Sequence, residues 1–308
     1  MRLSDHSALG RWAVLAALLV SLDTKSQELS KLGADSCLPC HGQGMPLDAT
    51  PIFQTRHAST TNPAAPFSGH QCEACHGPGA EHIHAQQRGL EGLPPVVYGT
   101  DSPTPTAEQN AVCLGCHQSG SRMAWHDSAH ASSDVPCAAC HAIHMERDPV
   151  FDPLAQQQAC FDCHPRRRSD IHKATAHPLR FGSMSCSDCH DPHNGDHERL
   201  LVEATINETC YRCHAEKQGP YLWEHAPAAE DCGLCHQPHG SNHPALLVRR
   251  PPLLCQTCHA AEGHPSLALT GDSLESVAEN RFLLGRACLN CHSQVHGSNH
   301  PSGATLHR

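Results

Sequence analysis

The sequence has few of the residues from which a protein core is usually built. Aromatic residues make up 4% of its 308 residues, against 24 prolines and 22 glycines, and the mean hydropathy is −0.43. A chain of this length normally buries a large apolar core. The composition therefore predicts that cofactors supply most of the hydrophobic interior, and that the chain without them is essentially unfolded.

Basic residues and long apolar runs are also scarce. The 21 Lys and Arg residues stand against 31 Asp and Glu, and the formal net charge of −10 lacks the basic surface typical of nucleic-acid binding. The apolar run at 12–22 is shorter than the about 20 residues of a membrane-spanning helix. Arg2 and Arg11 precede this run and polar residues follow it, so we expect a secretory signal peptide over residues 1–26, with an uncleaved anchor as the alternative.

No cysteine stands outside a single motif type, because all 20 belong to ten Cys-x-x-Cys-His motifs. The cysteines are Cys37, Cys40, Cys72, Cys75, Cys113, Cys116, Cys137, Cys140, Cys160, Cys163, Cys186, Cys189, Cys210, Cys213, Cys232, Cys235, Cys255, Cys258, Cys288 and Cys291. The closing histidines are His41, His76, His117, His141, His164, His190, His214, His236, His259 and His292.

This motif is the attachment site of c-type haem, because its two thiols reach the two vinyl groups and its histidine reaches the iron. The sequence therefore predicts ten covalently bound c-type haems. Structural zinc sites are one alternative, but they need four ligands and do not require His directly after every second Cys. A disulfide framework is another, but it is typical of short secreted domains with varied cysteine spacing.

The motifs recur at short intervals. Successive first cysteines are 35, 41, 24, 23, 26, 24, 22, 23 and 33 residues apart, which indicates a repeat protein. The repeating unit contains two motifs, since an odd motif is followed by a distant histidine and an even motif by a close one. Gln-Pro-His-Gly-Ser-Asn-His-Pro at 237–244 recurs almost unchanged at 294–301.

The repeat selects one further histidine per motif. We expect these ten to be the distal ligands of the haem irons: His57, His82, His130, His144, His177, His193, His225, His239, His264 and His296. His70, His84 and His300 compete with His57, His82 and His296. Two imidazoles on each iron predict low-potential haems without an open position. The order along the chain leaves open which distal histidine serves which haem.

The sequence gives weaker signals for the remaining polar residues and for the secondary structure. We expect His126, His172, His197 and His243 to bind propionates or face solvent. The arginine runs at 166–168 and 249–250 either pair with propionates or form solvated basic patches. Asp152-Pro153 predicts the start of a short helix carrying Cys160, with similar starts near Thr106 and Asn207. No segment alternates as a strand would.

At this point the chain resembles a known family, the periplasmic decahaem cytochromes of bacterial porin–cytochrome conduits, of the metal-reducing and dimethyl-sulfoxide-respiring types. The resemblance rests on the ten-motif array over about residues 30–301. It also rests on Cys-Glu-Ala-Cys-His-Gly-Pro-Gly-Ala-Glu-His (72–82), Cys-Ser-Asp-Cys-His-Asp-Pro-His (186–193) and Cys-Gly-Leu-Cys-His-Gln-Pro-His-Gly-Ser (232–241).

The resemblance implies a multihaem cytochrome c, mostly irregular with short α-helices wrapped around a haem chain. Two pentahaem halves, residues 27–168 and 169–308, would form an elongated wire. It implies a periplasmic protein associated with the outer membrane through a β-barrel porin. Its further partners would be a surface multihaem cytochrome or an extracellular donor or acceptor, and periplasmic or inner-membrane c-type cytochromes.

We therefore predict an electron-transfer protein that carries electrons between the periplasm and the outside of the cell. A free periplasmic electron shuttle is the first alternative, because it would use the same haem chain without a porin. A multihaem nitrite or hydroxylamine oxidoreductase is the second. Such an enzyme needs an iron with an open position, which ten distal histidines argue against.

Overall fold

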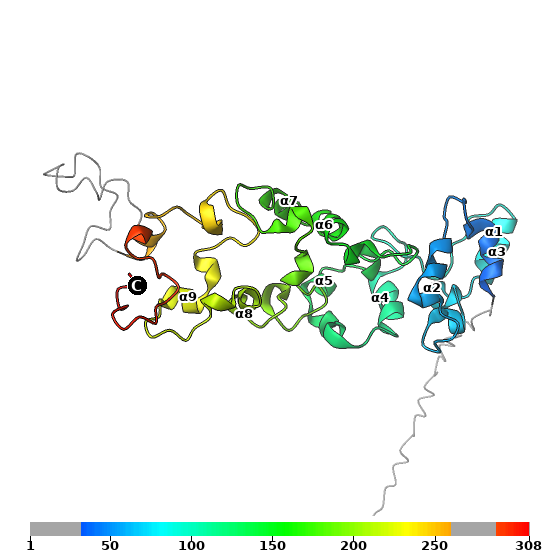
Figure 1. Ribbon diagram of the computed structural model, residues 1–308. Helices are drawn as coiled ribbons and strands as arrows, with labels where there is room; N and C mark the ends of the chain where they lie inside the picture. Colours follow the sequence, from blue (N-terminus) through cyan, green and yellow to red (C-terminus); the bar gives the residue numbers. More distant parts are fainter. Residues whose placement is uncertain (1–31, 260–287, 308) are drawn as a thin grey trace, which may run out of the picture.

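The computed structural model describes residues 32–259 and 288–307, and it is elongated (Figure 1). The chain advances along the long axis from α1, α2 and α3 at one end to the C-terminal residues at the other (Figure 1). The expected signal peptide, residues 1–26, and the expected ligand His264 lie outside the described residues.

Short helices joined by irregular chain make up the described part, as the sequence predicted. The α-helices are α1 (Leu38–His41), α2 (Glu73–His76), α3 (Ala80–Gln87), α4 (Thr106–Leu114), α5 (Ala129–Ser132), α6 (Pro153–Phe161), α7 (Pro165–Asp170), α8 (Ile206–Tyr211) and α9 (Ala226–Glu230). Single 3-10 turns lie between them, many of them on the Cys-x-x-Cys-His motifs. The described residues contain isolated β-bridges but no strand.

The predicted helix starts are confirmed. The Asp152 carboxylate caps α6 by accepting hydrogen bonds from the amides of Leu154 and Ala155, at 3.0 and 2.9 Å. The Thr205 hydroxyl accepts from the amide of Glu208, whose carboxylate accepts from the Thr205 amide, forming a capping box on α8. The two capped helices carry the first cysteine of a motif near their C-terminal ends, Cys160 in α6 and Cys210 in α8.

The polypeptide buries few large apolar side chains of its own. Among the described residues, the buried hydrophobic ones are Ala34, Ala65, Phe67, Ala124, Trp125, Ile171 and Leu201. Three of these seven are alanines, so the chain lacks the continuous apolar core that stabilises a domain of this size. Within the described ranges, no helix has both the length and the apolar character that crossing a membrane requires.

Two of the isolated β-bridges tie neighbouring repeats together. Thr175 bridges Ser241, and the equivalent Trp223 bridges Ser298, through paired backbone hydrogen bonds of 2.8–2.9 Å. The glycine before each serine makes this approach possible. Gly240 has a φ of +143°, and a Cβ there would stand 2.0 Å from a backbone oxygen, so a side chain cannot be accommodated. The bridges join segments more than 60 residues apart.

Candidate functional site

Each Cys-x-x-Cys-His motif forms one helical turn. In all ten motifs the amide of the histidine donates to the carbonyl of the first cysteine, at 2.9–3.1 Å. Residues three and four apart on such a turn share a face, so both thiols and the imidazole of each motif are directed to the same side. None of the twenty cysteines is fully buried. The backbone is therefore in the conformation that presents two thiols and one imidazole to a single macrocycle.

The first thiols of successive motifs meet in pairs. The pairs are Cys37 with Cys72, Cys113 with Cys137, Cys160 with Cys186, Cys210 with Cys232 and Cys255 with Cys288, whose thiols lie close enough to shift each other's pKa. Each pair joins an odd motif to the even motif that follows it. The two haems attached to such a pair of motifs would therefore have their attachment points next to each other.

The second thiols make the alternate links. Burial, together with the nearby thiols of Cys113 and Cys116, raises the pKa of Cys75 to about 11. The same proximity relates Cys140 to Cys163, Cys189 to Cys213 and Cys235 to Cys258. These links run from each even motif to the next odd one. First and second thiols together connect all ten motifs in the order of the sequence.

Nine motif histidines each face one histidine from outside the motifs. The pairs are His41–His82, His57–His117, His76–His144, His130–His164, His141–His193, His177–His214, His190–His239, His225–His259 and His236–His296. Their ring centroids are 5.8–6.4 Å apart. The structure thus brings nine of the ten sequence-predicted distal histidines opposite a motif histidine.

That separation fits one iron between two imidazoles. A metal–imidazole bond is about 2.0–2.1 Å, and with roughly 1.1 Å from each Nε2 to its ring centre, two ligating rings have centroids about 6 Å apart. Direct contact between the rings would be shorter. With the thiols of the same motif beside each pair, the residues fit a covalently bound haem with two axial histidines.

Hydrogen bonds at Nδ1 hold many of these rings. His76, His190 and His236 contact the carbonyls of Val96, Arg199 and Ala245 at 2.9, 3.1 and 2.8 Å. His130, His177 and His225 contact the carbonyls of Pro192, Pro238 and Val295 at 3.0, 2.8 and 2.8 Å. Since a carbonyl only accepts, the proton resides on Nδ1, and Nε2 is left as the metal ligand.

These carbonyl contacts also decide which repeat supplies each ring. Pro192, Pro238 and Val295 each precede a histidine that faces the iron position of an earlier motif. The distant histidine of one two-motif unit is therefore oriented by a carbonyl of the next unit, about 60–70 residues later. This carbonyl belongs to the residue directly before the close histidine of that unit. The pair His141–His193 crosses the expected boundary at residue 168 in the same way. The division into two pentahaem halves stays a prediction.

Burial keeps several of the paired imidazoles neutral. It lowers the pKa of His76, His117, His144, His193, His239 and His296, and that of His239 to about 4. A histidine must be neutral to bind a metal, because protonation occupies the ligand lone pair. These rings are therefore in the ligating form at neutral pH.

The tenth motif differs in the described residues. His292 Nδ1 contacts the carbonyl of Thr305 at 2.7 Å, like the carbonyl contacts of His76, His190 and His236. Its ring centroid lies 4.2 Å from that of His307, and the two Nε2 atoms are 3.4 Å apart. Two metal bonds require about 4 Å between these nitrogens, so this pair as it stands does not match the other nine. The predicted partner, His264, lies outside the described residues.

Among the described residues, the competing histidines do not face a motif histidine. His70 and His84 take part in no ring pair there, and the His300 ring instead contacts the Ser302 hydroxyl at 3.0 Å. His197 contacts the carbonyl of Leu201 at 3.0 Å. His243 Nδ1 is buried without a hydrogen-bond partner among the described residues, as is Arg122 Nε. A haem propionate would accept a hydrogen bond from either atom. From the sequence, a propionate contact is one of the two alternatives expected for His243, whereas none is expected for Arg122.

Sequence reasoning missed a set of buried amide side chains. Asn207 donates to the carbonyls of Ala228 and Ala229 and accepts from the amide of Cys232, at 3.1, 3.0 and 2.8 Å. Asn110 makes the equivalent bonds to Val135 and Cys137. Each Asn stands three residues before an odd motif and fixes the start of the next one. An amide at this position, with Gln157 before Cys160, is the signal that could have found them.

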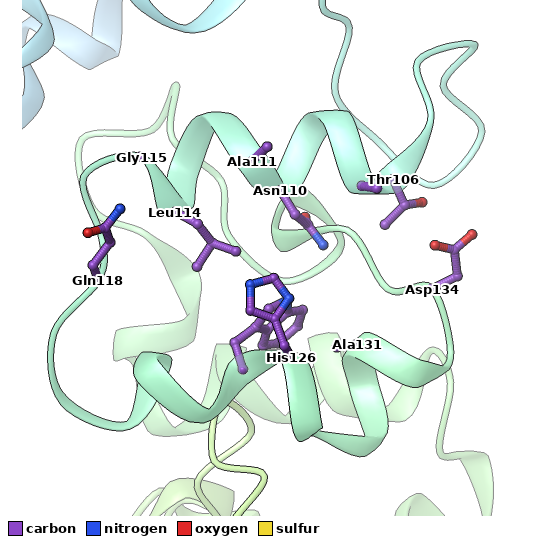
Figure 2. Close-up of a pocket in the computed structure, with 11 residues that line it drawn as sticks. Thr106, Asn110, Ala111, Leu114, Gly115, Gln118, His126, Ala131 and Asp134 are labelled. Atoms are coloured by element: carbon purple, nitrogen blue, oxygen red, sulfur yellow. The ribbon is translucent and has the colours of Figure 1, made fainter.

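A hollow of about 390 Å³ lies between α4 and the 3-10 segment Gly120–Asp127 with α5. Figure 2 shows the His126 ring inside it, below Leu114 and Asn110. Neither a cysteine nor any of the paired histidines lines this hollow. It is therefore separate from the array of thiols and imidazoles, and His126 faces it rather than a motif.

Comparison with known proteins identifies similar chains. A family model of the doubled CXXCH motif matches residues 177–219 and 225–264, and a model of cytochrome c-type proteins like NrfB matches residues 72–153. The chain is 47% identical over 292 residues to the multiheme cytochrome MtrA of Shewanella baltica, covering 94% of this chain and 86% of that protein.

Two shorter matches are to the cytochrome c-type protein NrfB. The Escherichia coli protein is 29% identical over 142 residues, which are 44% of this chain and 67% of that protein. The Haemophilus influenzae protein is 31% identical over 98 residues, which are 30% and 43% of the two chains.

Proposed function

The chain belongs to the MtrA family of multihaem c-type cytochromes, which are electron-transfer proteins, and we propose that it carries electrons through ten bis-histidine haems between the periplasm and the outside of the cell. When bound, haem supplies the one-electron chemistry, since its iron changes oxidation state and electrons pass between neighbouring macrocycles. The protein residues supply attachment, ligation and spacing.

The facing histidines carry this proposal. Nine pairs at iron-spanning distance support two protein ligands on each of nine irons, which leaves no position for a substrate. For the tenth iron we propose His292 with His264. The motif histidines would be the proximal ligands and their partners the distal ones. This ligand set favours electron transfer over chemistry at an open iron.

The order of the motifs supports a linear path. Thiol contacts join every motif to the next one along the chain. The molecule is elongated along the same direction, so the first and the tenth motif belong to opposite parts of it (Figure 1). A line of this kind passes electrons end to end, whereas a compact cluster would mainly store them.

We propose that a porin holds this wire in the outer membrane. Its electrons would be exchanged with periplasmic or inner-membrane c-type cytochromes at one end, and with a surface multihaem cytochrome or an extracellular donor or acceptor at the other. Isolation of the outer-membrane fraction tests this point. Co-purification of a porin at one-to-one stoichiometry is expected, and recovery of the cytochrome from the soluble periplasm alone would favour a free shuttle.

Low-temperature electron paramagnetic resonance of the oxidised holoprotein tests the ligation. We expect ten haems per chain by pyridine haemochrome, all of them low-spin, because each iron has two imidazole ligands. His193→Ala should convert one haem of the ten to high-spin and leave the count at ten. A high-spin signal of one equivalent in the unaltered protein would contradict complete bis-histidine ligation.

A further inference from the structure

The pair His141–His193 differs from the other facing pairs in what its Nδ1 atoms meet. The Asp148 carboxylate accepts a hydrogen bond from His141 Nδ1 at 2.6 Å. On the opposite ring, Asp191 Oδ1 lies 3.4 Å from His193 Nδ1. Both rings of one pair thus face a carboxylate, whereas the Nδ1 hydrogen bonds of the other described pairs go to backbone carbonyls.

Equivalent positions in the next repeats make the contrast direct. His190 and His236 close even motifs as His141 does, and their Nδ1 atoms contact the carbonyls of Arg199 and Ala245, nine residues further on. In the motif of His141 the chain places Asp148 there instead. The first position after the motif histidine is Asp191 in one repeat and Gln237 in the next. The carboxylates are therefore particular to this one pair.

Asp148 is held in place by two backbone amides. Its Oδ1 accepts from the amides of Ala142 and Val150, both at 3.3 Å, which leaves Oδ2 directed at His141. The side chain of Asp148 is 12% exposed, so water has little access to the contact. A charged acceptor in such a place acts more strongly on its donor than it would in water.

Three neighbouring residues complete the surroundings. The buried Trp125 ring lies 6.2 Å from that of His193, and the Phe151 ring lies 6.4 Å from that of His141, both measured between centroids. Burial lowers the pKa of His193, and so do the nearby His141 and the charge of Arg122. Arg122 therefore acts in the opposite sense to the carboxylate of Asp191. Arg122 makes no hydrogen bond to either ring in the described residues, so the two carboxylates have the direct contacts.

Among the described residues, one other paired histidine has a carboxylate oxygen within 4 Å of its ring. Glu216 Oε1 lies 3.7 Å from His214 Nδ1, but the two side chains are 60% and 55% exposed. Solvent screens an interaction of that kind. The opposite ring of that pair, His177, contacts the carbonyl of Pro238. In the pair His177–His214 a carboxylate therefore faces only one of the two rings, and its effect on that ring is weak.

We propose that Asp148 and Asp191 make the haem between His141 and His193 the lowest-potential site of the array; this rests on the proposed bis-histidine ligation. A carboxylate that accepts the Nδ1 proton makes the imidazole a stronger donor to the metal. The stronger donor favours the ferric over the ferrous iron, which lowers the potential. The fourth position of the wire is then the last to be reduced, and electrons pass it by an uphill step.

Replacement of Asp148 by Asn tests the proposal in the full-length holoprotein. Asparagine keeps the shape and an acceptor oxygen, so the change removes mainly the charge. Reductive titrations of the original protein and of Asp148→Asn are followed by haem absorbance and subtracted. Haems with unchanged potential cancel, and the expected difference is one haem of the ten, at the low-potential end, reduced more readily by about tenfold, or 59 mV for one electron.

Matched variants define the outcome. Asp191→Asn should shift the same haem in the same direction by a smaller amount, because its contact is longer. Asp152→Asn, which removes a charge four residues from Asp148 but retains the cap of α6, should give a flat difference. A flat difference for Asp148→Asn, or an amplitude spread over several haems, would overturn the proposal.

Two control measurements separate this test from that of the ligation. The haem count and the low-spin signal of each variant report on the two axial histidines, while the titration reports on their carboxylates. If the ligation were wrong, the unaltered protein would already show a high-spin equivalent. If only the tuning were wrong, ten low-spin haems would remain and the titration curves would coincide.

Discussion

At the residue scale, hydrogen bonds to backbone groups decide where the motifs and ligands stand. A histidine binds metal with Nε2 only if Nδ1 keeps its proton and the ring is correctly directed. In this chain the carbonyls of Pro192, Pro238 and Val295 do this for His130, His177 and His225. The buried amides of Asn110 and Asn207 do the corresponding work for the start of the motifs at Cys137 and Cys232.

Asn207→Ala is expected to destabilise the holoprotein by about 2 kcal/mol, because the change leaves the half-buried Cys232 amide and the carbonyls of Ala228 and Ala229 without their side-chain partner. Guanidinium unfolding followed by far-UV circular dichroism measures the change. Asn290→Ala, at an exposed position inside the last motif, is the matched control and should change little. Equal unfolding curves for the two variants would show that Asn207 does not hold the next motif.

At the element scale, short helices serve to deliver motifs rather than to form a core. None of the described helices exceeds nine residues, and isolated helices of that length are marginal in water. Caps therefore matter more than they would in a long helix. Asp152 on α6 and Thr205 on α8 satisfy amides that the helix itself cannot.

Asp152→Ala should destabilise α6 by about 1 kcal/mol, since it removes the acceptor of the Leu154 and Ala155 amides. Hydrogen exchange with mass spectrometry measures this locally. The amides of Pro153–Phe161 should exchange roughly fivefold faster, which corresponds to about 1 kcal/mol. Asp152→Asn keeps a capping oxygen and should exchange nearly as the original protein does; equal acceleration in both variants would contradict capping by the side-chain oxygen.

At the scale of the whole molecule, the haems take the place of a hydrophobic core. The described chain buries seven hydrophobic residues and leaves large ones such as Phe151, Phe181 and Leu47 exposed. Nine facing histidine pairs and the contacting thiols lie along an elongated path instead. The cofactors would thus connect segments that otherwise share little apolar surface.

Chain produced without haem attachment is therefore expected to be unfolded. Burial of the macrocycles supplies most of the apolar free energy, and the chain alone cannot offset its loss of conformational entropy. Far-UV circular dichroism should show a disordered spectrum and no cooperative transition on heating. A native-like cooperative transition of the haem-free chain would mean that the polypeptide has a core of its own.

The sequence by itself determined the predicted attachment sites, because haem attachment depends on a local pattern. Two thiols and an imidazole within one turn require only five residues. It also predicted helices starting at Pro153 and near Thr106 and Asn207, since helix starts depend on neighbours in the chain. The repeat spacing further selected nine histidines that the structure brings opposite a motif.

Only the tertiary structure decided which histidines face one another. A distal ring is supplied across distances of about 30 to 70 residues, and its direction depends on carbonyls from another repeat. The carboxylates around His141 and His193 illustrate the same limit. Asp148 lies seven residues from one ring and Asp191 two from the other, yet no local pattern shows that both rings belong to one pair, because that pairing arises from contacts between repeats.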